Sequence, residues 1–332
     1  MVVIGIVLYN SSADLPACWA SLTAQTYPHL QIIFLDNYSS DASVEWVQKH
    51  APQSTLICSD VNQGFGPAHN AIMQSYAFQP TDYYLPLNPD VSLSATYIEQ
   101  LVSGCERHQA GWVSGKLLEK DEHDQPSGYF YSAGQGIRRD GYVVNRGEGV
   151  QDRGQYDDDA EVFFVSGAAP LIAARMIQAV SVEGALFDPQ MFMYGEDADL
   201  GWRAKLQGWS CWYIPSAVAL HRGGNPNVSL RAQALINTFL SIVKNAFLLD
   251  LIFYNFPLIF LSLGVRMLLR PQQTWPAVRQ FFSRLMPTLK RRTQPTLSRS
   301  EIVRWFRWSE QQTSHQATGL VQRVRTYLSR KT

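Results

Sequence analysis

The chain contains 332 residues, of which 46% are hydrophobic and 17% are charged. This composition excludes an intrinsically disordered protein, and the length is sufficient for one large α/β domain with an appendage. Equal numbers of basic and acidic residues, 28 of each, hide an asymmetry: residues 1–263 hold 14 Lys and Arg against 26 Asp and Glu, whereas residues 264–332 hold 14 against 2. The basic tail predicts a neutral or anionic surface as its partner.

The start of the chain and its cysteines are typical of a cytoplasmic protein. The apolar run over residues 2–8 has no basic segment before it and is shorter than the core of a signal peptide. The cysteines are scattered without metal-ligand spacing, at Cys18, Cys58, Cys105 and Cys211. We therefore expect free, buried thiols in a reducing compartment.

Strands and helices alternate through the first part of the chain. Runs of β-branched and aromatic residues predict strands over 2–8, 32–35, 55–58 and 83–87, and helical spacing of apolar residues predicts helices over 14–25, 42–49 and 67–76. This alternation predicts an α/β fold with a mainly parallel sheet and helices on both faces. Residues 119–160 are rich in glycine and turn formers, which predicts a hairpin or loop over the sheet edge before a strand at 162–165.

Polar residues follow several of these predicted strands. Asp36 ends one, Asn88-Pro89-Asp90 follows another, and Glu196-Asp197 follows a further strand predicted at 190–195. Ligands of open α/β sheets bind at the carboxyl ends of the strands, so these side chains are candidates for a shared site. Taken singly, each string is also explained as a turn or as acidic residues at a helix N-terminus. Together with His221, they are able to hold a divalent cation and a general base.

The ordered motifs of the chain resemble those of family 2 glycosyltransferases of the GT-A fold, in their rhamnosyltransferase-like branch. The resemblance covers roughly residues 2–224, and so many motifs in the same order make chance similarity very improbable. The matching strings are Tyr9-Asn10, Ser21-Leu22-Thr23-Ala24-Gln25-Thr26-Tyr27-Pro28, the segments 36–41 and 62–70, Leu87-Asn88-Pro89-Asp90, Ser166-Gly167-Ala168, and the segment 192–203.

The resemblance implies a role for each motif residue. Asp197 would be the catalytic base of a direct in-line attack that inverts the anomeric centre, and Glu196 would orient it or bond the acceptor. Asp90 and His221 would bind one Mg²⁺ or Mn²⁺, which stabilises the leaving diphosphate. The implied nucleotide-sugar ligands are Tyr9, Asn10, Asp36, Asn62, Gly64, Asn88, Asp90 and Arg203.

Two of these assignments have an alternative. Asn88 stands where many GT-A enzymes have the first aspartate of Asp-x-Asp, which makes it the weaker ligand. Arg203 is placed either to reach a phosphate or to pair with Asp199 at i,i+4, and the pairing is slightly favoured.

The predicted reaction moves a single sugar from a nucleotide-sugar donor, with dTDP-L-rhamnose as first choice, to a glycolipid or polysaccharide-precursor acceptor. The processive members of the family carry Gln-x-x-Arg-Trp before membrane helices, and the nearest string here, 301–305, lacks the glutamine. The alternatives are a transferase of another NDP-hexose and an inactive glycan-assembly scaffold. A sugar nucleotidylyltransferase would need an N-terminal glycine-rich loop with a basic residue, and residues 9–13 have neither.

The chain is predicted to divide into a catalytic domain over 1–228 and a helical, basic region over 229–332. Residues 246–263 are apolar, but Asp250, Asn255 and Pro257 interrupt them, which disfavours a membrane-spanning helix. With Trp275, Trp305 and Trp308 interleaved among its cations, the region is predicted to bind peripherally to the anionic inner face of the cell membrane. The alternatives are packing on the acidic catalytic domain and, more weakly, nucleic acid, for which no binding module is present.

Overall fold

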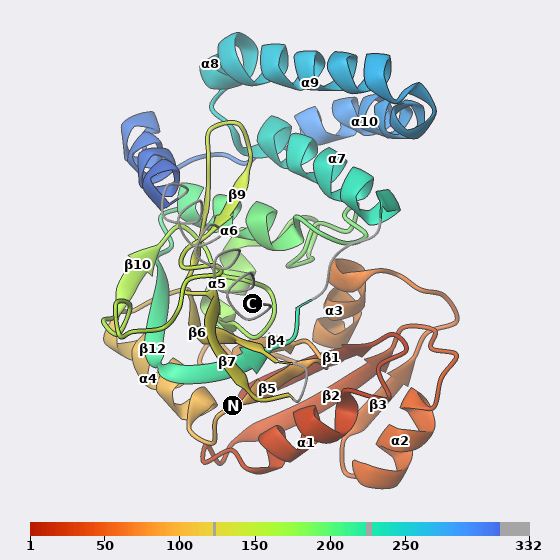
Figure 1. Cartoon of the computed structure of the whole chain (residues 1–332), viewed down its shortest axis with the longest axis vertical. Helices are drawn as coiled ribbons and strands as arrows, with labels where there is room; N and C mark the ends of the chain where they lie inside the picture. Colours follow the sequence, from red (N-terminus) through yellow and green to blue (C-terminus); the bar gives the residue numbers. More distant parts are fainter. Residues whose placement is uncertain (122–123, 224–227, 313–332) are drawn as a thin grey trace, which may run out of the picture.

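A computed structural model describes residues 1–121, 124–223 and 228–312. Its centre is a ten-stranded sheet in the order β10-β12-β6-β11-β4-β1-β2-β3, with β5 paired to β12 and β7 paired to β6 (Figure 1). The strands are β1 (Val2–Leu8), β2 (Leu30–Asp36), β3 (Thr55–Cys58), β4 (Tyr83–Leu87), β5 (Val91–Leu93), β6 (Trp112–Lys120), β7 (Pro126–Ser132), β10 (Ala160–Val162), β11 (Leu171–Ala173) and β12 (Cys211–His221). A separate two-stranded sheet joins β8 (Gln135–Ile137) to β9 (Val143–Asn145).

Helices cover both faces of the sheet, as predicted. The helices are α1 (Leu15–Thr23), α2 (Ser43–His50), α3 (Phe65–Gln74), α4 (Tyr97–Arg107), α5 (Ala174–Val180), α6 (Glu196–Leu206), α7 (Val228–Asn245), α8 (Leu248–Asp250), the π-helical turn η1 (Leu251–Asn255), α9 (Phe256–Leu269) and α10 (Pro271–Lys290). Residues 299–312 form a further helix. Apolar side chains of α1, α2 and α4 pack with one face of the sheet, and those of α3, α5 and α6 pack with the other.

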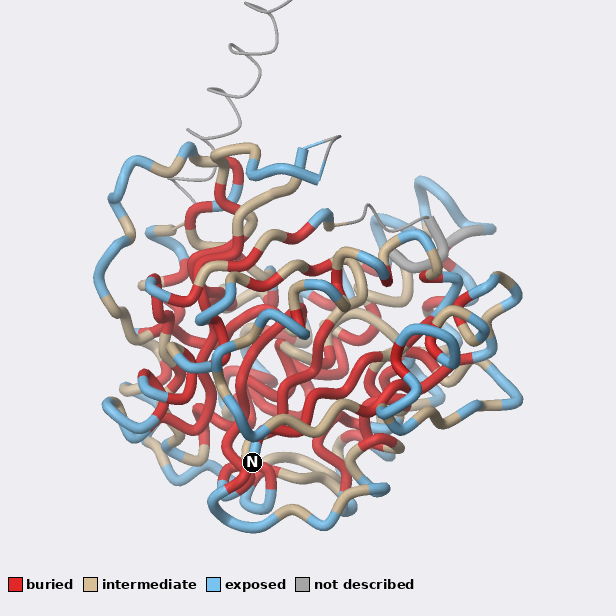
Figure 2. The backbone as a smooth tube through the Cα atoms, turned by 90° about the horizontal axis from the view of Figure 1, so that it is seen from below, coloured by how far each residue is buried: buried red, intermediate tan, exposed pale blue. Residues whose placement is uncertain are grey.

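The mainly parallel pairing is confirmed for the first half of the chain. β1 lies between β2 and β4 in parallel register, and β2 pairs in parallel with β3. Further along, β11 runs antiparallel between β4 and β6, so this half of the sheet is mixed. The centre of the sheet, red in Figure 2, is buried. Because its strands are held by this packing, the ends of β2, β4 and β12 have fixed positions.

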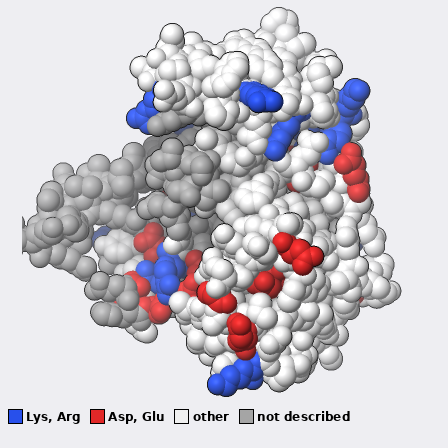
Figure 3. All heavy atoms as spheres, turned by 90° about the vertical axis from the view of Figure 1, so that its right-hand side faces the viewer, with Lys and Arg blue, Asp and Glu red and all other residues white. Residues whose placement is uncertain are grey.

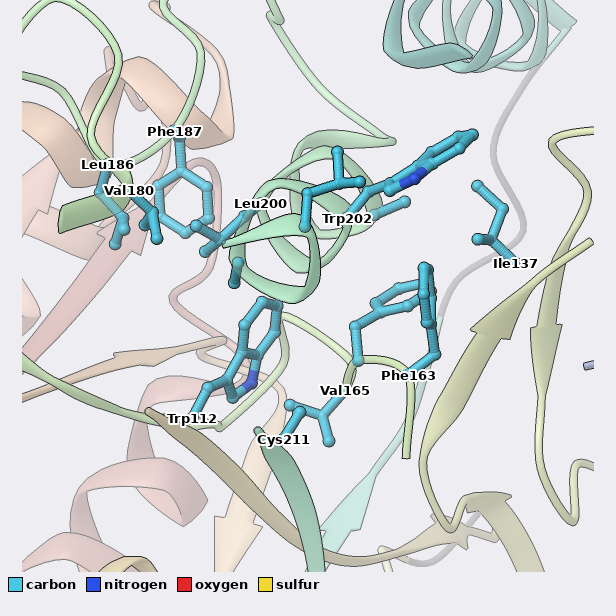
Figure 4. Packing of buried hydrophobic residues seen from close by; sticks show 14 of the residues in the cluster. Trp112, Ile137, Phe163, Val165, Val180, Leu186, Phe187, Leu200, Trp202 and Cys211 are labelled. Carbon is cyan, nitrogen blue, oxygen red and sulfur yellow. The ribbon is translucent and has the colours of Figure 1, made fainter. Parts of the chain in front are cut away.

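The core beneath helix α6 fixes the position of that helix. Leu200 and Trp202 are buried on α6, and both belong to a cluster with Trp112 of β6 and Phe163 (Figure 4). These are large, fully enclosed side chains, so a shift of α6 would open a cavity.

The C-terminal helices are part of the same structure. Trp305 and Phe306 are buried against Phe163, and Trp202 contacts Phe306 edge to face. The C-terminal helices as far as residue 312 therefore pack on the catalytic domain, as one of the predicted alternatives requires. Trp305, one of the tryptophans that motivated the prediction of membrane binding, is buried in this packing, and residues 313–332 lie outside the described part of the chain.

Three other local expectations need correction. Residues 190–195 form turns and not a strand, because Tyr194 and Gly195 take left-handed backbone angles that no strand accommodates. Pro257 does not interrupt its helix: it lies in the first turn of α9, where a missing backbone N–H is tolerated, after the π-helical turn η1. Cys58 is exposed, while the other three cysteines are buried.

Candidate active site

The two catalytic candidates open helix α6. Gly195 takes a left-handed conformation with φ 93°, which turns the chain sharply into the helix that begins at Glu196. The side chain of Asn237 on α7 donates to the carbonyls of Met193 and Tyr194 over 3.1 and 2.7 Å. The acidic pair is therefore supported by the loop before α6 and by α7, and not by the predicted strand.

Asp197 accepts hydrogen bonds from two backbone N–H groups. Its Oδ1 accepts from the N–H of Ala198 over 2.8 Å and its Oδ2 accepts from the N–H of Gly167 over 3.3 Å. Burial raises the pKa of Asp197, and the two N–H groups oppose that shift because they bind the charged form. Asp197 also lines the central cavity of the molecule. A carboxylate in this setting is a suitable general base.

Glu196 differs from its neighbour. It is 7% exposed, and within the described residues its Oε2 has no hydrogen-bond partner. Burial, and then the charge of Asp197, raise the pKa of Glu196. Two adjacent carboxyl groups in one buried site tend to share a proton, and the one with fewer donors holds it. The shared proton therefore favours Glu196 over Asp197, whose carboxylate has the two backbone donors.

Asp90 and His221 meet as predicted. His221 is the last residue of β12, and β5 runs antiparallel beside it, with Val91 opposite His221. Nε2 of His221 lies 3.3 Å from Oδ2 of Asp90, and the ring of Tyr131 packs edge-on against the imidazole at 4.2 Å. Burial raises the pKa of Asp90, but the hydrogen bond and charge of His221 outweigh it and leave this pKa below its ordinary value. The carboxylate is thus ionised and paired.

The donor set of this pair fits a hard divalent cation. A carboxylate oxygen and an imidazole nitrogen are ligands that Mg²⁺ or Mn²⁺ accepts. Nδ1 of His221 is buried without a hydrogen-bond partner among the described residues, so the ring has a second nitrogen with an unmet hydrogen-bonding capacity. No group of three or more His, Cys, Asp or Glu side chains comes together in the described ranges. Most of the coordination sphere would therefore come from a diphosphate and water.

A short segment links the cation-binding candidates to the base. The N–H of Asn88 donates to the carbonyl of Ala168 over 2.9 Å, while the adjacent Gly167 donates to Asp197. Asn88, Asp197 and His221 all line the same cavity. The Ser166-Gly167-Ala168 motif therefore fixes the spacing between the end of β4 and the N-terminus of α6.

Three predicted nucleotide ligands lie at the ends of β1 and β2. Asp36 closes β2, is buried, and accepts from the N–H of Ser39 through both oxygens, at 3.3 and 3.2 Å. Asn10 takes a left-handed backbone conformation, and its Oδ1 accepts from the N–H of Ser40 over 2.8 Å. Tyr9 is 51% exposed beside them. The structure brings these three residues together at one edge.

The predicted loop residues Asn62 and Gly64 are held by Asn37. The side-chain amide of Asn37 donates to Oδ1 of Asn62 and to the carbonyl of Gly64, both over 3.1 Å. Gly64 has φ 84°, and a Cβ added to it would lie 1.9 Å from the carbonyl oxygen of Phe192. Only glycine fits there, and the loop before α3 is thereby tied to the segment before α6.

The prediction that Arg203 binds the nucleotide sugar is wrong. Its side chain is 1% exposed, donates to Oδ2 of Asp199 over 2.8 Å, and also bonds the carbonyls of Val180 and Leu186. The alternative pairing with Asp199 is confirmed. Arg203 supports the packing of α6 and does not line the cavity.

Sequence reasoning missed the residues that hold the site together. Asn37 bonds Asn62 and Gly64, and Tyr131 packs on His221. Neither residue was assigned a role from the sequence, although Asn37 lies inside the 36–41 string. Lys244 on α7 contacts both Asp188 and Asp199 over 2.7 Å, across 56 and 45 residues of sequence. A lysine in an amphipathic helix is normally a surface residue, so no local signal identified Lys244.

A cavity of about 2070 Å³ lies beside the acidic pair and His221. One part is lined by Asn88, Asp197 and His221, and it continues between the β8–β9 hairpin, α7 and α9. A mixed α/β sheet with two carboxylates, an imidazole and a wide cavity at its strand ends defines an enzyme of the nucleotide-sugar transferase class.

Comparison with known proteins agrees with this class. The family model described as "Glycosyl transferase family 2" matches residues 3–164. An "N-acetylglucosaminyl-diphospho-decaprenol L-rhamnosyltransferase" from Mycobacterium tuberculosis is 26% identical over 235 residues, which are 65% of this chain and 74% of the relative. Residues 3–164 thus match the family 2 glycosyltransferase model, and the chain is similar to a rhamnosyltransferase, in agreement with its motifs.

Solved structures agree on the fold. A structure described as "GalNAc-T7 with UDP, GalNAc and Mn2+" has a TM-score of 0.56 at 11% identity, over 74% of this chain and 48% of that one. The chain thus spans about half of this neighbour. The 1–349 segment of S. aureus TarS "in complex with UDP-GlcNAc" has a TM-score of 0.50 at 12% identity, over 87% and 90% of the two chains. The GT-A fold is therefore confirmed.

Proposed function

We propose that this enzyme transfers a single sugar, with inversion, from a nucleotide donor to a lipid-diphosphate-linked glycan. The first choice of donor is dTDP-L-rhamnose, which the rhamnosyltransferase relative and the Asn88-Pro89-Asp90 string support. The observation that carries the reaction type is the placement of Asp197: its carboxyl group lies on the cavity wall with two backbone N–H donors, beside the segment that also holds Asn88.

The chemistry follows from this placement. The acceptor hydroxyl oxygen forms a bond to the anomeric carbon of the donor while the bond from that carbon to the diphosphate oxygen breaks. Asp197 takes the hydroxyl proton, and the electron pair of the broken bond leaves with the nucleoside diphosphate. A cation held by Asp90 and His221 would supply positive charge for that leaving group. A neutral Glu196 would not compete with Asp197 for the acceptor proton, and its unpartnered Oε2 would be free to bond the acceptor.

In this proposal, the nucleotide-sugar donor binds at the edge formed by β1, β2 and the loop before α3. Asp36, Asn10 and Tyr9 are placed to contact the base and ribose, and the loop of Asn62 and Gly64 borders the same edge. The four free cysteines support work in the reducing cytoplasm, where nucleotide sugars are the donors. We propose that the enzyme acts there, at the inner face of the cell membrane.

An inactive assembly scaffold is the competing proposal. A scaffold needs neither an ionised base nor a buried pair of carboxyl groups. Burying Glu196 without a hydrogen-bond partner for its Oε2 costs free energy, and a scaffold would gain nothing in return. The same fold with another NDP-hexose donor is the nearer alternative. Pocket shape rather than these motifs decides between donors.

The test combines a donor panel with Asp197→Asn. Purified protein is supplied with Mn²⁺, a polyprenyl-diphosphate-linked acetamido sugar and, in turn, dTDP-rhamnose and other NDP-hexoses, and the released nucleotide is measured. We expect transfer from dTDP-rhamnose, a loss of about 10²–10⁴-fold in Asp197→Asn, and unchanged donor binding by calorimetry. Transfer from a different donor alone corrects the choice of sugar, and no turnover with any donor supports the scaffold.

A further inference from the structure

One helix of the C-terminal layer exposes an apolar surface. Residues Leu248–Leu269 form a 22-residue helix with a mean hydropathy of 1.8 in its most apolar window, of which 28% is buried. Among the described residues, it is the one helix long and apolar enough to cross a membrane. The largest exposed fractions are 77% at Phe253, 85% at Leu268 and 75% at Leu269. Contiguous exposure of this kind on a helix marks an interaction surface.

The apolar surface continues onto α10. The ring of Phe260 on α9 stacks on that of Phe282 on α10 with centroids 6.3 Å apart. Trp275 and Met286 of α10 are 59% and 60% exposed. We call the outer side of Leu248–Leu269, together with Trp275, Phe282 and Met286, the docking face. Its aromatic side chains are those that favour the boundary between lipid and water.

The exposed charges on the two helices of the docking face have one sign. Asp250 within Leu248–Leu269 is buried, and residues 251–300 contain no Asp or Glu. Arg266, Arg270, Arg279 and Lys290, on these helices or between them, are exposed. In Figure 3 the upper, helical layer is largely uncharged, with its Lys and Arg mostly toward its lower margin and acidic side chains below it. Apolar side chains with only cations beside them are complementary to an anionic bilayer surface, to which each Lys or Arg adds about 1 kcal/mol.

The helix is anchored along its inner side, so it lies on the molecule and does not leave it. Its buried positions Leu251, Ile259 and Leu263 recur on one side. Asp250 is 6% exposed and pairs with Arg299 over 2.7 Å and with Arg139 of the β8–β9 hairpin. Asn255 also donates to the carbonyl of Arg139 over 2.8 Å. Spanning a bilayer would break these contacts and expose a charged aspartate to lipid.

The cavity connects this layer to the catalytic base. Leu258, Leu261 and Arg266 of α9 line the same cavity as Asp197. We propose that the docking face lies in the anionic surface of a bilayer and opens this cavity toward the lipid. A lipid-linked acceptor then remains anchored in the bilayer while its sugar reaches Asp197. The delivery of an acceptor rests on the proposed function, whereas the binding to lipid does not.

The first experiment measures lipid binding by the full-length chain. Wild type, the docking-face variant Phe253→Glu/Leu268→Glu and a control with the same added charge, Gln48→Glu/Gln53→Glu, are sedimented with vesicles of phosphatidylcholine containing or lacking phosphatidylglycerol. Gln48 and Gln53 are exposed at the far end of the catalytic domain. We expect wild type and control to bind the anionic vesicles, and the docking-face variant to bind about tenfold or more weakly. Thermal unfolding verifies that all three proteins are folded.

Two results overturn the docking proposal: equal binding by all three proteins, or a concentration-dependent dimer of wild type, without vesicles, that the docking-face variant abolishes. The latter result would assign the face to a second copy of the chain. The variant Phe253→Gln/Leu268→Gln adds no charge, and its retention of wild-type binding would also contradict insertion of the apolar side chains.

A second experiment separates this inference from the proposed function. Transfer to the lipid-linked acceptor is measured in anionic vesicles and in detergent micelles. We expect the docking-face variant to lose activity only with vesicles. If wild type binds vesicles through the face but transfers no sugar in either medium, the docking proposal stands and the proposed function fails. If wild type and the docking-face variant transfer equally in vesicles, the docking proposal fails.

Discussion

Nζ of Lys244 lies 2.7 Å from Oδ2 of Asp199, and this contact ties α7 to the helix that carries Asp197. Both side chains are almost fully buried, at 1% and 0% exposure. Asp199 also accepts from Arg203 and from Asn245, and Lys244 also contacts Asp188. Burial raises the pKa of Asp199, but the charges of Lys244 and Arg203 outweigh it and lower that pKa. Asp199 is therefore ionised, and the network connects the catalytic domain to the C-terminal helices.

Replacing Lys244 by methionine leaves two buried carboxylates short of a cation. Removing one partner of a buried ion pair costs about 3–5 kcal/mol, because the remaining charge is uncompensated. We expect Lys244→Met to lower the free energy of unfolding by that amount in urea titrations. Lys49→Met, at an exposed position on α2, serves as the control and changes stability by less than about 0.5 kcal/mol. Equal midpoints for both variants would contradict a structural role for the network.

The Asp90–His221 pair predicts metal-dependent donor binding. We expect Asp90→Ala to remove the Mn²⁺ dependence of nucleoside diphosphate affinity in calorimetry, and to reduce the transfer rate roughly a hundredfold or more. Asp60→Ala removes an exposed carboxylate after β3 and is the matched control. Unchanged Mn²⁺-dependent affinity in Asp90→Ala would exclude Asp90 as a cation ligand.

Glu196 predicts a pH dependence of stability with a definite sign. Burial raises its pKa in the folded state above the ordinary value, so the folded protein binds more protons than the unfolded chain between those two pKa values. Stability from this group is full below the unfolded pKa and is lost as the pH rises through the folded one. Asp197 and Tyr194 are the titratable neighbours coupled to it.

We therefore expect Glu196→Gln, which stays neutral, to lose less stability than wild type as the pH rises from 5 toward 8. Urea titrations at each pH measure the slope, and Glu183→Gln at an exposed site should keep the wild-type slope. Identical slopes in wild type and Glu196→Gln would show that Glu196 is ionised with an ordinary pKa.

The elements that the sequence predicted well are those with local signals. Asp36 at the end of β2 and Asp90 in the turn after β4 follow apolar runs whose period and length are readable from a few residues. The prediction of a strand before Glu196 was wrong. Residues 190–195 have the composition of a strand end, but the turn that they form depends on the left-handed backbone angles of Tyr194 and Gly195.

The tail was harder because cations alternating with tryptophan are compatible with two environments. Trp275 is exposed, but Trp305 is buried, with Nζ of Lys205 lying 4.2 Å from the centre of its ring. Spacing within the tail does not distinguish these positions, since the partner of Trp305 is 100 residues earlier in the chain. Asp199 is a similar case. Its partner Arg203 lies four residues later on the same helix and could be predicted from that spacing, whereas its partner Lys244 on α7 could not.

Gly64 provides a prediction with a matched internal control. Alanine in the left-handed α region costs about 1–2 kcal/mol in backbone strain, and Gly64, with φ 84° and ψ −175°, takes a conformation that is essentially restricted to glycine. At Gly64 the new Cβ would also meet the carbonyl oxygen of Phe192 at 1.9 Å, whereas at Gly128, with φ 78°, it would meet nothing within 4 Å. Gly64→Ala should therefore destabilise the protein more than Gly128→Ala, because relieving the overlap displaces the segment before α6. The same displacement moves Glu196 and Asp197, so the transfer rate should fall in Gly64→Ala alone. Urea titrations and rates of both variants check this, and equal losses in the two would show that the loop before α3 does not position the catalytic helix.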